Sequence, residues 1–131
     1  MSFRELTPAS LRAPFGAYAH GIEVPPGWRL VRTSGQLGIG ADDEIPNDAR
    51  AQADLCFDAI GKILAAAEMG VSDVAHISAW VTDRAHMEPY MAARDAFMAP
   101  ANHLPASTLV IVSGFTRPEF KVEIEVMAAA K

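Results

Sequence analysis

The chain is 131 residues long, half of its residues are hydrophobic, and its formal net charge at pH 7 is -5. This length suits one domain with a hydrophobic core, so residues 1–131 are treated as a single domain. The 11 Lys and Arg residues are scattered, which argues against nucleic acid as a partner. Because no apolar run approaches the roughly 20 residues of a membrane span and no signal-like segment opens the chain, we expect neither membrane insertion nor export.

The apolar content is high for a domain this small, so we expect self-association that covers apolar surface. Cys56 is the single cysteine, which excludes an intramolecular disulfide, fits a cytoplasmic location and predicts a small core residue. The four histidines lack the spacing of a zinc site. The glycines near residues 35–40 lack the sequence of a nucleotide-binding loop. We therefore expect no metal and no cofactor.

The first predicted elements are two strands followed by a helix. Residues 18–24 and 28–34 are strand-like and are separated by a Pro-Pro-Gly turn, which predicts a hairpin. After glycines and an acidic loop, Asn47 or Asp48 can cap a helix that runs to about Met69, with a glycine as its stop. Apolar residues recur on one face of this helix, so we expect it to pack on a sheet.

The second half of the chain alternates between strands and helices. Residues 74–82 have the length and β-branched content of a strand, and residues 86–98 are predicted to form a helix. Residues 108–112 and 120–128 are two further strands separated by a bend. The expected order is ββαβαββ, an α+β domain in which a mixed sheet carries two helices on one face.

The last strand-like segment, Phe120–Met127, alternates apolar and polar residues and places Glu123 and Glu125 on one face. Their Cα atoms are then roughly 7 Å apart, so each carboxylate raises the pKa of the other unless water or a cation lies nearby. Such a strand either borders solvent or lines a site. In a partly desolvated cleft, Glu123 would suit a general base, whereas a solvated or ion-paired carboxylate would be structural.

Several short motifs follow one another in an order typical of one family: Gly16–His20, Thr33–Gln36, Gln52-Ala53, Val81–Asp83, Leu104–Ala106 and Val122–Glu125. Together they resemble the RidA/YjgF family, small proteins with a chorismate-mutase-like fold whose best-known members are trimeric enamine/imine deaminases. The resemblance covers nearly the whole chain and agrees with the ββαβαββ order. It implies a homotrimer that binds a small molecule in clefts between adjacent subunits. The family has also been labelled ribonuclease, which the acidic composition does not support.

In the deaminating members, a glutamate positions the water that attacks the imine carbon, and the resemblance implies this catalytic role for Glu123. Tyr18, Ser34 and the backbone of Gly35 match family positions that line the same cleft. An arginine of the family pairs with the substrate carboxylate. In this chain the hydroxyl of Ser107 stands at that position.

Two further positions of the family cleft also differ, because a cysteine corresponds to Leu109 and a helix asparagine to Met91. Serine offers one neutral donor where a guanidinium grips a carboxylate through two charge-assisted hydrogen bonds. We therefore expect a ligand less acidic than the usual 2-imino acid, unless Arg32, Arg94 or Arg117 replaces the missing group.

Functions from different classes are consistent with these residues. One is hydrolysis of a small reactive enamine or imine, with Glu123 as the base. Another is a non-enzymatic small-molecule-binding or regulatory trimer with a mostly apolar pocket. A protein-interaction module is a third.

Overall fold

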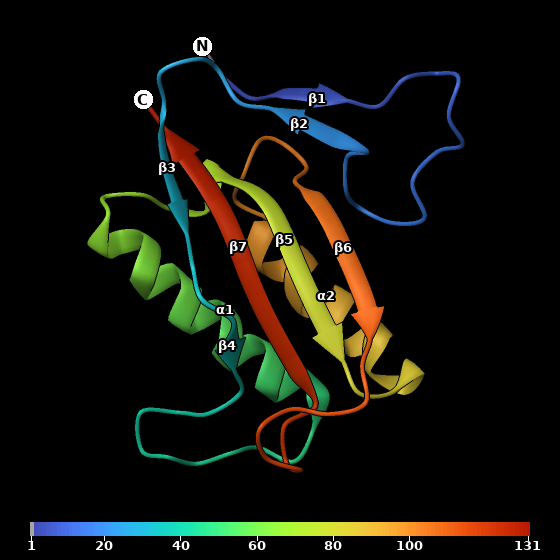
Figure 1. Ribbon diagram of the computed structural model, residues 1–131, viewed down its shortest axis with the longest axis vertical. Coiled ribbons are helices and arrows are strands. Elements are labelled where there is room, and N and C mark those ends of the chain that lie inside the picture. Colours follow the sequence, from blue (N-terminus) through green and yellow to red (C-terminus); the bar gives the residue numbers. More distant parts are fainter. Residues whose placement is uncertain (1) are drawn as a thin grey trace.

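Two helices lie on one face of a mixed β-sheet in the computed structural model, which describes residues 2–131 (Figure 1). A smaller two-stranded sheet lies at one end. In chain order the elements are β1 (Arg4–Leu6), β2 (Gly21–Glu23), β3 (Arg29–Arg32), β4 (Gln36–Leu37), α1 (Ala49–Ala66), the 3₁₀ turn η1 (Val71–Asp73), β5 (Val74–Val81), the 3₁₀ turn η2 (Arg84–His86), α2 (Met87–Met98), β6 (Ala106–Ile111) and β7 (Val122–Ala130).

The main sheet has the strand order β3-β7-β5-β6, and β4 also pairs with β7. The β5 and β6 strands are parallel and are connected through α2, whereas β7 is antiparallel to β3, β4 and β5. Helix α2 covers the same face of the sheet as α1 (Figure 1). The predicted α+β fold, a mixed sheet with two helices on one face, is confirmed.

The predicted hairpin between residues 18–24 and 28–34 is wrong. Strand β2 pairs with β1, while β3 pairs with β7 near the carboxyl end of the chain. The alternation of side chains identifies a strand but does not choose its partner. Pairing with β7 sets Val31 opposite the fully buried Ala128, so β3 extends the hydrophobic core.

Helix α1 begins where the sequence predicted, because the side chain of Asp48 accepts a hydrogen bond of 3.0 Å from the backbone N–H of Ala51. It ends at Ala66, a few residues before the predicted stop at about Met69. The chain leaves the helix there because Glu68 takes a left-handed conformation with φ 59°.

The hydrophobic core lies between the helices and the sheet. Ile60 and Leu64 of α1, Ile77 of β5 and Ile124 of β7 are completely buried. Cys56 is buried among them, as predicted. Burial above all, and then the charge of a nearby carboxylate, raises the pKa of the Cys56 thiol to about 12, so this thiol stays protonated at neutral pH. Among residues 2–131, neither helix is long and apolar enough to cross a membrane.

One polar side chain in the core, Gln52, holds two loops beside the sheet. Its amide nitrogen donates to the backbone carbonyls of Pro46 and Glu119 at 2.8 and 2.9 Å. Its amide oxygen accepts a hydrogen bond of 2.8 Å from the N–H of Lys121, which directly precedes β7. A buried amide with these bonds fixes the start of β7 against α1.

We expect Gln52→Ala to lower the free energy of unfolding by about 3 kcal/mol, since it leaves buried backbone groups without partners at about 1–3 kcal/mol each. Urea unfolding followed by circular dichroism measures the loss. Asp58→Ala, on the exposed face of α1, is the matched control and is expected to change stability by less than about 0.5 kcal/mol. A loss below about 1 kcal/mol for Gln52→Ala would contradict this role.

Candidate functional site

The face of the sheet opposite the helices carries both carboxylates of β7. Val122 and Ile124 are completely buried under the helices. Glu123 and Glu125 alternate with them, point to the other face and are half-buried. The prediction that the two glutamates share a face is confirmed.

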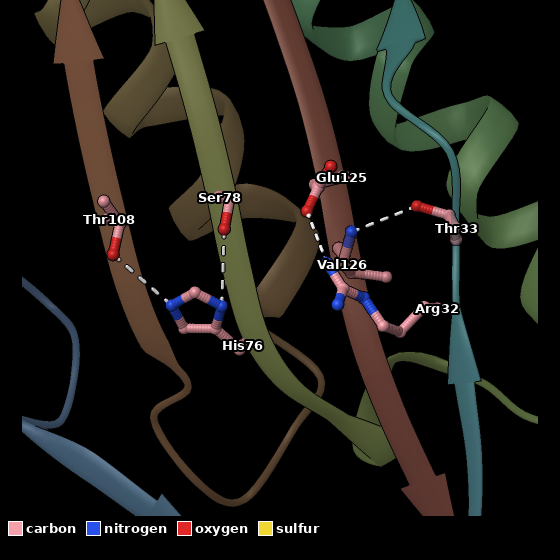
Figure 2. Close-up of polar contacts among 7 residues, drawn as sticks. All are labelled: Arg32, Thr33, His76, Ser78, Thr108, Glu125 and Val126. Atoms are coloured by element: carbon pink, nitrogen blue, oxygen red, sulfur yellow. Dashed lines mark hydrogen bonds and ion pairs between the residues drawn. The ribbon is translucent and has the colours of Figure 1, made fainter.

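Glu125 is part of a polar network on this open face (Figure 2). Its carboxylate forms an ion pair with the guanidinium of Arg32 at 3.3 Å. The ring of His76 lies between the hydroxyls of Ser78 and Thr108, at 3.3 and 3.4 Å. Burial lowers the pKa of His76, Glu125 acts against this effect, and Arg32 adds to it. Glu125 therefore has a counterion within its own chain.

Glu123 differs from Glu125 because it forms no ion pair within the described residues 2–131. Burial above all, and then the charge of Glu125, raises its pKa above the ordinary value for a glutamate. Of the two carboxylates, Glu123 is thus the one better suited to accept and return a proton.

A bulge on the strand beside β7 lies next to Glu123. Between β3 and β4, residues 33–35 face only residues 125–126 of β7, so one strand carries an extra residue. Thr33 fixes the start of this bulge. Its N–H donates to the carbonyl of Val126 at 3.0 Å, and its hydroxyl accepts from the N–H of Val126 at 3.1 Å (Figure 2).

The bulge brings Gly35 beside Glu123, and Ser34 directly precedes Gly35 in the bulge. A Cβ atom on Gly35 would lie 2.6 Å from Oε2 of Glu123, so the carboxylate approaches the backbone at a point where only glycine leaves room. Gly35 and Glu123 are thus in contact, and together with Ser34, the residue before Gly35, we call them the carboxylate cluster.

A second cluster lies at the start of β6, on the side of the sheet that faces α2. The guanidinium of Arg94 donates from Nη1 to the hydroxyl of Ser107 at 3.3 Å and lies 5.9 Å from the ring centroid of Tyr18. A parallel bridge between Ala19 and Ala106 holds Tyr18 beside β6. We call Tyr18, Arg94 and Ser107 the arginine cluster.

The remaining predicted residues, Met91 and Leu109, are partly buried against the hydrophobic core. Tyr90, which the sequence did not predict as a site residue, lies beside the arginine cluster. It lies 5.9 Å, ring centroid to Cζ, from Arg94 and is completely buried. Its position four residues before Arg94 puts both residues on one face of α2. This spacing was the feature of the sequence that could have indicated Tyr90.

The two clusters are too far apart in one chain to bind the same small molecule. Glu123 lies opposite Trp80, and Trp80 lies opposite Val110. Ser107 precedes Val110 by three residues. Two strand spacings and three residue rises separate Glu123 from Ser107 by roughly 14 Å, and the odd offset puts them on opposite faces of the sheet.

Two hollows in the surface of residues 2–131 leave the clusters apart as well. One of about 410 Å³ lies between Phe3, Trp28 and His103, and no predicted site residue lines it. Another, of about 190 Å³, is lined by the network around Arg32 and His76. No group of three His, Cys, Asp or Glu side chains suited to a metal ion occurs in this described part of the chain.

The arrangement of two helices on one face of a ββαβαββ sheet defines the chorismate-mutase-like class of folds. The sequence model of one family of this class, described as "Endoribonuclease L-PSP", matches residues 9–130. The chain therefore belongs to this family, which is the RidA/YjgF family that the motifs indicated.

Relatives of known structure or activity agree with this assignment. A 2-iminobutanoate/2-iminopropanoate deaminase of Escherichia coli K12 is 29% identical over 121 residues, 91% of each chain. YyfB of Yersinia pestis, from the conserved Rid protein family, superimposes with a TM-score of 0.87 at 25% identity over 99% of this chain and 100% of its own. E. coli TdcF with bound serine has a TM-score of 0.73 at 26% identity over 98% and 99%.

Proposed function

We propose that the protein hydrolyses a small, reactive enamine or imine in a cleft between two subunits of a homotrimer, with Glu123 as the general base. The observation that carries the proposal is the state of Glu123. This carboxylate has no counterion in the described chain, has a raised pKa and lies against the backbone of Gly35. The deaminase of E. coli, similar over 91% of the chain, supports the reaction class.

The separation of the two clusters supports a shared cleft. A small ligand cannot reach Glu123 and Ser107 of one chain, which lie on opposite faces of the sheet. It can reach both when the carboxylate cluster of one protomer meets the arginine cluster of the next. A head-to-tail interface of this kind closes into a ring, as in a trimer.

In the proposed reaction, Glu123 takes a proton from water while the water oxygen bonds to the carbon of the protonated imine. The C=N double bond becomes a single bond, and its electron pair passes to nitrogen, which becomes a neutral amine. Glu123 then returns its proton to this amine, the C–N bond breaks and ammonia leaves, while the hydroxyl proton passes to water and the ketone forms. A carboxyl group with a raised pKa is suited to both transfers.

Generating 2-aminoacrylate in situ and following ammonia release tests the proposal. We expect the protein to accelerate the release, with the rate proportional to protein concentration. If the protein is instead a binding or regulatory trimer, ammonia release will equal the uncatalysed rate. The same small molecules will then only raise its thermal midpoint. That result would contradict the hydrolase.

A further inference from the structure

The guanidinium of Arg94 is buried, but no buried counterion among the described residues balances its charge. The side chain is 3% exposed. Its Nε donates to the carboxylate of Asp95 at 3.1 Å, but that carboxylate is half exposed, and Nη1 donates to the neutral hydroxyl of Ser107. Burying a charge costs several kcal/mol unless partners replace water, so a guanidinium kept here without a buried counterion indicates a ligand position.

The second terminal nitrogen of Arg94, Nη2, lies beside the loop at Gly16. It is 3.4 Å from where a Cβ on Gly16 would be, an ordinary contact distance. Nη2 has no hydrogen bond within the described residues, yet it is not among their fully buried unpartnered atoms. It therefore keeps contact with the surface, where a ligand can reach it.

An independent observation comes from Tyr90. Its hydroxyl is the one fully buried side-chain polar atom without a hydrogen-bond partner among residues 2–131. Burial raises its pKa to about 12, and the neighbouring Arg94 and Ser107 act against this rise. Unpartnered buried hydroxyls are rare in folded proteins. This one lies beside the same guanidinium.

The chemistry of the arginine cluster selects the kind of ligand. Arg94, Ser107 and Tyr90 supply N–H and O–H donors, while the one nearby carboxylate, Asp95, is already engaged at Nε. A group with an excess of donors and positive charge binds an anion, and a guanidinium fork fits the two oxygens of a carboxylate.

We propose that Arg94, reaching from α2 to the start of β6, forms a carboxylate subsite together with Ser107. The guanidinium that binds the substrate carboxylate thus comes from α2 in this chain. This inference rests on the proposed function, because it places the subsite opposite Glu123 of the neighbouring protomer. It reverses the expectation of a less acidic ligand.

Calorimetric titration with a stable keto acid and its neutral analogue tests the subsite. The probes are 2-oxobutanoate, the product expected from a 2-iminobutanoate, and 2-oxobutanamide, which lacks the charge. We expect the native protein to bind the acid at least about 30-fold more tightly than the amide, as for other buried charge-assisted contacts. Arg94→Gln should reduce this preference to about 3-fold or less.

Three more variants keep the test decisive, each first checked for assembly by size-exclusion chromatography. Arg117→Gln removes an exposed arginine and should leave the preference unchanged. Arg94→Lys retains the charge without the fork and should keep part of the preference. Ser107→Ala should weaken binding of the acid several-fold without affecting binding of the amide. If Arg94→Gln does not assemble, Ser107→Ala serves as the test of the carboxylate subsite.

Equal affinities for acid and amide in the native protein, or loss of the preference in Arg117→Gln instead of Arg94→Gln, would overturn the inference. So would unchanged acid binding in Ser107→Ala when Arg94→Gln does not assemble. The two proposals fail separately. Turnover that depends on Glu123 but not on Arg94 would refute the subsite alone, whereas an Arg94-dependent preference without turnover would refute the hydrolase alone.

Discussion

Glu123→Gln is expected to lower the turnover of 2-aminoacrylate by about 10²- to 10⁴-fold, the usual contribution of a general base, while the protein still assembles. Glutamine keeps the shape of the side chain but cannot take a proton from water. Steady-state ammonia release, with size-exclusion chromatography for assembly, measures the effect.

The matched control is Glu125→Gln, the neighbouring carboxylate on the same face. Glu125 pairs with Arg32 and is not assigned to the reaction. Because its charge helps raise the pKa of Glu123, its removal should shift the acidic limb of the pH–rate profile to lower pH. Turnover in Glu123→Gln equal to that of the native protein would remove the catalytic assignment.

Glu123→Gln is also expected to stabilise the fold at neutral pH. Since folding raises the pKa of Glu123, its contribution to stability is present below the ordinary glutamate pKa and is lost as pH rises through the folded value. Glu123→Gln should therefore have a higher thermal midpoint than the native protein at neutral pH and an equal one at about pH 4. A lower midpoint at neutral pH would show that the ionised carboxylate is favourably paired.

Gly35→Ala is expected to lower kcat/KM by about 100-fold, because displacing a reacting group by roughly 1 Å has costs of that order. The added Cβ would lie 2.6 Å from Oε2 and 2.7 Å from Cδ of Glu123. The end of a flexible side chain can move away, so we expect the carboxylate to shift and the fold to persist. Ammonia release and thermal unfolding, measured on one preparation, separate the two effects.

Gly114→Ala is the control for Gly35→Ala, because a Cβ there meets nothing within 4 Å. It should leave both turnover and the thermal midpoint unchanged. If Gly35→Ala and Gly114→Ala are equally active, the contact between the bulge and Glu123 has no part in the reaction.

The sequence predicted most elements of the fold because their signals are local. The cap at Asp48 and the alternation along β7 depend on neighbouring residues, and both are confirmed. The partner of β3 could not be predicted in the same way. The choice between β2 and β7 depends on which pairing buries Val31, a contact between residues almost 100 positions apart.

The candidate site shows the same division. The motifs indicated Glu123, Ser34 and Gly35, and the bulge sets Gly35, with Ser34 before it in the chain, against Glu123. The proximity of Arg94 to Ser107 depends on α2 crossing over the start of β6, so the sequence could name Arg94 only as one of three arginines. Tyr90 was missed because its hydroxyl matters only once that crossing is known.

The central claim, a site shared between protomers, is tested most directly by mixing two impaired variants. Each cleft should take Glu123 from one protomer and Arg94 from its neighbour. When Glu123→Gln and Arg94→Gln are co-expressed in equal amounts and assemble at random, about a quarter of all clefts then contain both native groups. We predict recovery of about a quarter of native turnover at low substrate concentration. Mixed trimers no more active than the separate variants would contradict a shared site.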